Sequence, residues 1–188
     1  MRLILNDDYI ELRDEMKEIV QTSFGIMQDV LGLAQHREDI ELEFCYPYAM
    51  KGAAAYIDSR RRFPMIMKCR ASIPLAEVIT SVAHETVHVD DFVKGKLVVS
   101  GGVSYEGSYI PGETVERLYN SNSRAAAMRM PHEFAAYTKG PLVAKEVFNR
   151  LPVRMLRPLI ESVSQTRFVP GVEASKVRAA LCAYADVS

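Results

Sequence analysis

The sequence has few cysteines, and their spacing excludes two classes of protein. Its 188 residues include three cysteines, Cys45, Cys69 and Cys182, and no CxxC pair. An odd number of widely spaced cysteines argues against a disulfide framework and against a zinc site built from thiolates. We therefore expect reduced thiols that are mostly buried.

Long apolar runs and a strong net charge are also missing. No stretch approaches the roughly 20 apolar residues that span a bilayer, and the opening MRLILNDDYIELRDE turns acidic too early for a signal-peptide core. The net charge of −1 provides no general attraction to nucleic acid or membranes. These absences predict a cytoplasmic protein without a membrane partner.

What remains is the composition of an ordinary globular protein. Hydrophobic residues make up 48% of the chain and charged residues 25%, and we find no internal repeat or low-complexity tract. The length suits one domain over residues 1–188 with a proper hydrophobic core. The sequence makes no prediction about the oligomeric state.

The spacing of apolar residues predicts an α+β fold with a small, mostly antiparallel sheet. The alternation in IELEFCYP indicates a half-buried strand, and two further strands are expected before residue 70. The expected elements are an N-terminal helix over 8–33, a sheet within 40–69, a helix over 74–94, a helix over 131–150 and C-terminal helices within 153–186. Between the second and third helices, residues 96–112 indicate a loop or irregular hairpin.

The helix predicted over 74–94 contains the pentapeptide HETVH at residues 84–88. His84 and His88 are one helical turn apart, so both imidazoles can reach a single metal ion. They belong to a polar stripe opposite an apolar one, together with Glu77, Ser81 and Asp91. The spacing therefore permits a two-histidine metal site on one face of the helix.

Glu85 supplies the second half of the pattern. It projects about 100° around the helix from His84, so it is badly placed to be a third ligand but well placed to act on a water held at the metal. A carboxylate in that place can remove the proton from the water, and zinc makes such a water acidic enough to lose it. We therefore expect one Zn²⁺ ion, with Glu85 as the general base.

A catalytic zinc site needs a third protein ligand. The continuation HExxHxxGxxH fails, because Asp91 and Lys94 occupy its glycine and histidine positions. The remaining candidates are downstream acids and His132. Glu133 is favoured, because it falls in the first turn of the helix predicted from Pro131 and is followed by small alanines that allow close packing.

The two segments together resemble the gluzincin branch of zincin metallopeptidases. AHETVHVDDFVKGKL followed by PHEFAAY is similar to small phage-encoded and bacterial metallopeptidase-like proteins. The resemblance implies a minimal zincin-like domain with His84, His88 and Glu133 as ligands. The chain departs from the pattern at His132, where tryptophan is usual, and at Ala135, where a second glutamate is usual.

The departure at His132 leaves two roles open for this residue. SprT-like proteins use a third histidine, so His132 is the alternative to Glu133 as third ligand. If Glu133 is the ligand, His132 is expected near the metal as a hydrogen-bond donor to a developing oxyanion.

Further residues are candidates for supporting roles. Zinc-bound imidazoles usually donate their outer N–H to a carboxylate or carbonyl, and Asp91 and Glu77 are the candidates on the same helix. Tyr105, Tyr109 and Tyr137 are candidate donors to a transition state. A solvated helix face and ordinary loop packing explain the same residues equally well.

The stretch SRRRFPMIMKCR carries a cluster of basic residues, including Arg60, Arg61 and Arg62. A soluble hairpin tip is the favoured interpretation, and a contact with nucleic acid is the alternative.

These features together predict a zinc metallopeptidase, a hydrolase that cleaves a peptide or protein substrate. A non-catalytic zincin-fold binding or virion-associated protein is one alternative. A SprT-like protease acting near nucleic acid is the other.

Overall fold

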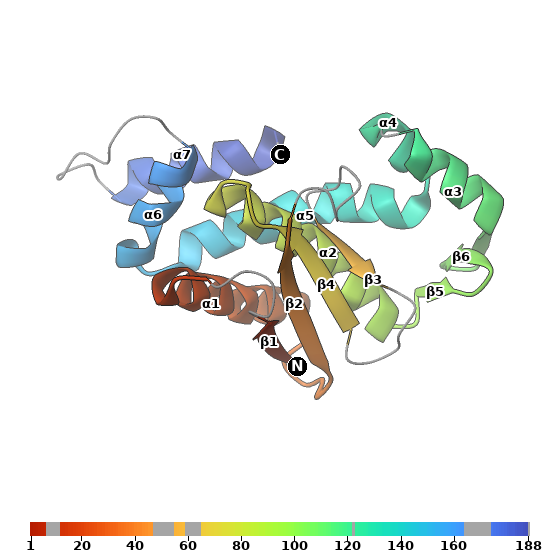
Figure 1. Cartoon of the computed structure of the whole chain (residues 1–188), viewed down its shortest axis with the longest axis horizontal. Helices are drawn as coiled ribbons and strands as arrows, with labels where there is room; N and C mark the ends of the chain where they lie inside the picture. The colour runs from red at the N-terminus through yellow and green to blue at the C-terminus, as the bar shows by residue number, and fades with distance from the viewer. Residues whose placement is uncertain (7–11, 47–54, 59–64, 122, 164–173, 188) are drawn as a thin grey trace.

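The computed structural model describes residues 1–6, 12–46, 55–58, 65–121, 123–163 and 174–187. The strands are β1 (Arg2–Asn6), β2 (Asp39–Cys45), β3 (Ala55–Asp58), β4 (Met65–Arg70), β5 (Leu97–Val99), β6 (Gly102–Tyr105) and β7 (Ser108–Pro111). The helices are α1 (Asp14–Leu31), α2 (Leu75–Val93), α3 (Gly112–Asn120), α4 (Arg124–Ala127), α5 (Pro131–Arg150), α6 (Val153–Val163) and α7 (Ala174–Val187). The predicted α+β class is confirmed (Figure 1).

The principal sheet has four strands in the order β1-β2-β4-β3, and its strand directions correct one prediction. Strands β1 and β4 both run parallel to β2, and only β3 and β4 pair antiparallel. A mostly antiparallel sheet was therefore the wrong expectation here. The chain places β3 at the edge and returns as β4 between β3 and β2, so the strand next to β2 runs in the same direction as β2.

Strand β1 lies where the sequence indicated only a short apolar run. Leu3 and Leu5 alternate with polar or exposed neighbours and pack against the core. Helix α1 then connects β1 to the parallel β2, which is the geometry of a crossover connection. The helix predicted over 8–33 is observed from Asp14 to Leu31, and residues 8–11 lie outside the described part of the chain.

One row of apolar side chains runs across the sheet in register: Leu5, Leu42, Met67 and Ile57. These residues belong to, or pack against, a core shared with α1, α2, α5, α6 and α7. Figure 1 shows the strands in front of α2 and α5. Burial of this core holds α2 against the sheet and so fixes the helix that carries HETVH.

The sequence left open whether the polar stripe of α2 faces solvent, and in the structure its second half is buried while its first half is half-buried. His88, Asp90 and Asp91 are buried, as is Glu85. The cover comes from α5, which makes the most extensive contact of any helix with α2. Polar groups on α2 therefore face a second helix instead of water.

Helix α5 extends unbroken through Gly140 and Pro141. At Gly140 the two helices approach closely, because a Cβ atom built there would lie 3.1 Å from the Cα of His84. Ala136 and Ala144, one turn to either side, are completely buried. Small residues thus bring α5 against α2 at the position of the first motif histidine.

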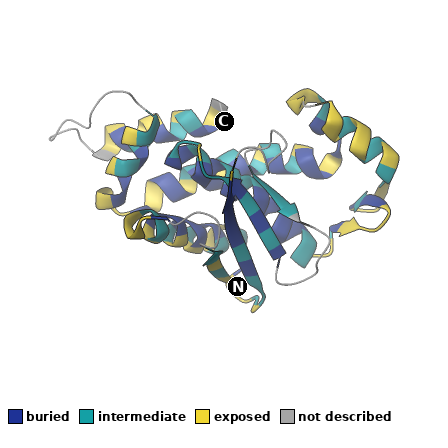
Figure 2. Ribbon diagram, in the orientation of Figure 1, coloured by how far each residue is buried: buried dark blue, intermediate teal, exposed yellow. Residues whose placement is uncertain are grey.

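Between α2 and α5 the chain forms a second, smaller layer. Strands β5, β6 and β7 form an antiparallel sheet, and α3 follows directly. No residue of α3 is buried, as its colouring in Figure 2 shows. The expected irregular hairpin over 96–112 is therefore an ordered three-stranded sheet.

Of two further predictions, one can be compared with the structure. Among the described residues, no helix is both long enough and apolar enough to cross a bilayer. Arg60, Arg61 and Arg62, proposed as a nucleic-acid contact, lie outside the described residues.

The tight crossing predicts that Gly140→Val lowers the free energy of unfolding by roughly 1–3 kcal/mol, since the added atoms overpack the contact with His84. Gly25→Val is the matched control, because Gly25 lies in α1 and a Cβ atom there meets nothing within 4 Å. Urea unfolding of both variants measures the difference. Equal stabilities would contradict the close approach of α2 and α5.

Candidate metal centre

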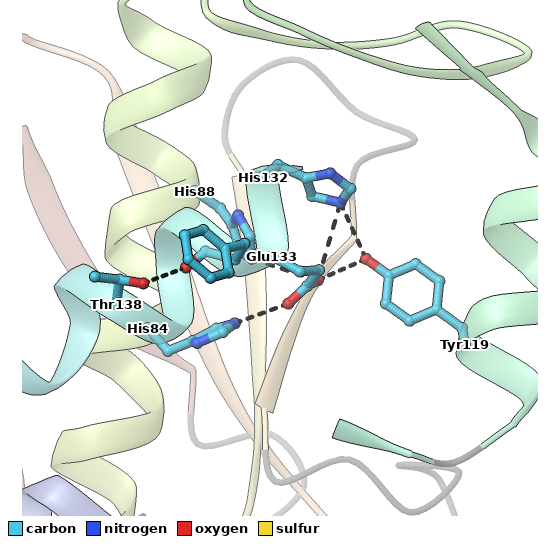
Figure 3. Close-up of polar contacts among 7 residues, drawn as sticks. His84, His88, Tyr119, His132, Glu133 and Thr138 are labelled. Atoms are coloured by element: carbon cyan, nitrogen blue, oxygen red, sulfur yellow. Dashed lines mark hydrogen bonds and ion pairs between the residues drawn. The ribbon is translucent and has the colours of Figure 1, made fainter. Parts of the chain in front are cut away.

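The two motif histidines lie on one face of α2, as their spacing predicts. Their ring centroids are 5.0 Å apart, and the rings are nearly perpendicular. The Nε2 atoms of His84 and His88 point toward the same carboxylate (Figure 3). Both imidazoles can therefore bind one ion.

That carboxylate belongs to Glu133, in the first turn of α5. Its Oε2 lies 3.3 Å from His84 Nε2, and its Oε1 lies 3.6 Å from His88 Nε2. His84, His88 and Glu133 each offer one ligand atom, and these three atoms lie within 4.8 Å of one another. Among the described residues there is no other group of this kind. Two imidazoles and a carboxylate, supplied by two helices, are a donor set that suits zinc.

Hydrogen bonds and charge attraction hold these three side chains together. Burial opposes the charge on Glu133, yet hydrogen bonds from His84 and His88 hold the pKa of this carboxyl well below its usual range. Burial would lower the pKa of His88, but Glu133, Glu85 and Asp91 together raise it. Buried carboxylates therefore stabilise a positive charge at this site.

Glu85 is buried next to this group and has a different environment. Burial raises the pKa of its carboxyl, and the nearby charge of Glu133 raises it further, while both histidines partly offset the shift. The backbone N–H of Ile57, on the edge strand β3, acts on the carboxylate as a hydrogen-bond donor. The sheet edge therefore helps to orient Glu85, and its raised pKa makes it a stronger base.

His132 is close to the three residues but does not belong to their group. Its Nε2 lies 4.0 Å from Glu133 Oε1 and 3.3 Å from the hydroxyl of Tyr119. Burial lowers the pKa of His132 to about 4, so the ring is neutral near pH 7. Of the two candidates for third ligand, the structure brings Glu133 to the histidine pair.

Tyr119 is a site residue that the sequence analysis missed. It lies on α3, and its hydroxyl donates a 2.6 Å hydrogen bond to Glu133 Oε1. Burial of the hydroxyl and the charge of Glu133 raise the pKa of Tyr119. In the sequence, Tyr119 lies in an amphipathic segment far along the chain from HETVH. Such a pattern does not predict which distant residue the tyrosine contacts.

The three tyrosines selected from the sequence have different positions. Tyr137 packs edge-on against His84, with centroids 4.6 Å apart, and Arg124 lies over its ring. Tyr105 is buried, with its ring centroid 6.5 Å from that of His132. Tyr109 is 59% exposed and donates to the Gly101 carbonyl, so the structure does not bring it to the histidines.

The two candidate supporting carboxylates also differ. Asp91 is fully buried one turn after His88, and the two groups interact electrostatically. Neither oxygen of Asp91 nor the Nδ1 of His88 has a hydrogen-bond partner of good geometry among the described residues, although the hydroxyl of Tyr105 lies near enough to Asp91 for this carboxylate to raise the pKa of Tyr105. Glu77 is half-buried nearer the start of α2, where its charge acts on Cys69.

The unpartnered Nδ1 of His88 supports the fit to a metal. An imidazole that binds through Nε2 carries its proton on Nδ1, and Asp91 is the nearby acceptor that would orient it. Burial raises the pKa of Asp91, and the charges of Lys139, His88 and Lys96 offset this rise only in part, so a cation bound to His88 would further stabilise the carboxylate.

Comparison of the chain with protein-family models, curated proteins and solved structures finds no match. The chemical interpretation of the site therefore depends on its residues and their geometry.

We predict that Asp91→Asn weakens zinc binding by about 10- to 100-fold, because a neutral amide oxygen replaces the charged acceptor that would orient His88 Nδ1 and raise the basicity of its ring. The metal-free variant should be at least as stable as the wild type, since an uncharged amide avoids the desolvation of a carboxylate. Calorimetric titration with zinc and thermal unfolding measure the two effects. An unchanged zinc affinity would show that Asp91 does not support His88.

Proposed function

We propose that this chain is a zinc-dependent peptidase with His84, His88 and Glu133 as metal ligands and Glu85 as general base. The convergence of Glu133 from α5 on the two histidines of α2 is the observation that carries the proposal. The proposal includes one zinc ion, a peptide or protein substrate and a cytoplasmic location. The resemblance of both segments to gluzincin-type proteins supports the same reaction.

The proposed reaction assigns one role to the metal and another to Glu85. When bound, zinc would polarise a carbonyl and make a coordinated water acidic. Glu85 would accept the proton of the attacking water and later deliver it to the leaving amine, a task that its raised pKa favours. A purely structural zinc has no use for a buried base of this kind, which supports an enzyme over a binding scaffold.

Tyr137 and His132 border the same site. Tyr137 packs on the ring of His84, and His132 lies beside Glu133. We assign His132 the role of a neutral neighbour that can donate one N–H, in keeping with its lowered pKa. Neither residue is needed as a ligand.

Glu85→Gln should lower the rate of peptide hydrolysis by roughly 10²–10⁴-fold, the usual contribution of a general base. Zinc content should remain at one ion per chain, because Glu85 is not a ligand. Elemental analysis of the purified protein and turnover of a casein or peptide-library substrate give the two readings. A scaffold without catalysis would show no turnover in either form.

His88→Ala should abolish stoichiometric zinc binding, because two ligands remain. Zinc at about 100 times its dissociation constant should stabilise the wild type by about 2.7 kcal/mol and leave the variant unchanged. Melting temperatures with a chelator and with added zinc test this expectation. His36→Ala is the control, since His36 pairs with Glu38 away from the site. If zinc does not raise the wild-type melting temperature, the proposed centre is wrong.

A further inference from the structure

The hydroxyl of Tyr119 and the ring of His84 lie on opposite sides of the Glu133 carboxylate (Figure 3). Tyr119 reaches Oε1 at 2.6 Å, and His84 Nε2 lies 3.3 Å from the other oxygen, Oε2. The two oxygens of the ligand carboxylate therefore have different neighbours. Oε1 accepts from a hydroxyl of α3 and lies 3.6 Å from His88 Nε2, and Oε2 faces the first motif histidine.

The protons of this group can be assigned from the chemistry of its members. An ionised carboxylate has no proton, so the short contact is a hydrogen bond donated by Tyr119 to Glu133. A phenol has only one proton, so its 3.3 Å contact with His132 Nε2 requires the ring N–H to donate to the hydroxyl oxygen. The result is two successive hydrogen bonds, in which His132 donates to Tyr119 and Tyr119 donates to Oε1 of Glu133.

This series of hydrogen bonds affects whether the Glu133 carboxylate would bind a metal through one oxygen or through both. Two histidines and a carboxylate bound through both oxygens provide four donor atoms, which fill a tetrahedral site, so that a water could bind only as a fifth ligand. The same three residues with one carboxylate oxygen provide three donors, which leaves the fourth position for a water or substrate. A hydrogen bond that occupies one oxygen of Glu133 therefore keeps the fourth coordination position of the metal open.

We propose that Tyr119 is a positioning residue that engages Oε1 of Glu133, so that this carboxylate binds the metal through Oε2 alone. The inference depends on the proposed metal site, and it adds a role for α3 that the peptidase proposal does not contain. Tyr119 would act on the ligand without touching the substrate.

The position of Tyr119 in the fold supports this role. Helix α3 contacts β6, β7 and α4, so the small layer between α2 and α5 holds the tyrosine in place. Tyr119 is 46% exposed, and only its hydroxyl end reaches inward to Glu133. Replacing it with phenylalanine would remove one oxygen atom and leave the packing of the ring unchanged.

The test uses cobalt(II) in place of zinc, because the visible spectrum of protein-bound cobalt reports its coordination number. We expect Tyr119→Phe to bind one cobalt ion with a loss of visible-band intensity, as Glu133 turns both oxygens to the metal and the site becomes five-coordinate. Tyr109→Phe is the matched control, since it removes a hydroxyl from the same layer that bonds only to the Gly101 carbonyl. Its spectrum should equal that of the wild type.

Three results would overturn the inference. If Tyr119→Phe and the wild type have superimposable spectra, Tyr119 does not control how Glu133 binds, and the peptidase proposal stands. If Tyr109→Phe changes the spectrum equally, the effect comes from the layer as a whole and not from the bond to Glu133. If the wild type binds no cobalt or zinc, the metal centre itself is wrong and the inference falls with it.

Discussion

The close crossing of α2 and α5 is the constraint on which the site depends. Glu133 is 45 residues beyond His88, and it reaches the two histidines because α5 lies directly against the helix that carries them. Gly140 allows that approach, with no side chain between the two backbones at His84. A larger residue at this position would separate the donors, because helices in contact are spaced by the side chains between them.

The crossing also determines the electrostatics. Packing of α5 and of the sheet against α2 buries Glu85, Asp91 and His88, and Glu133 is buried from the opposite side. Buried charges are tolerated when they are paired or bind a metal. The contacts of Glu133 with the histidines compensate part of this charge, and a divalent cation would complete the compensation. The same burial that makes the site costly gives Glu85 the raised pKa that a base needs.

A second part of the chain adds to the site from outside the helix pair. The layer of β5, β6 and β7 leads into α3, which presents Tyr119 to Glu133. On the other side, the edge strand β3 presents a backbone N–H to Glu85. Glu133 and Glu85 are therefore each held by a neighbour that lies on neither α2 nor α5, which orients the two carboxylates independently.

Local patterns in the sequence were sufficient for part of this description. The spacing of HETVH placed His84 and His88 on one helical face, and Pro131 marked the start of α5, because helical periodicity and termini depend on near neighbours. Tertiary structure alone decided the parallel strands around β2, the burial of Asp91 and the approach of Tyr119 to Glu133. These depend on contacts between residues far apart in the chain, and the periodicity of a segment carries no information about which other segment will cover it.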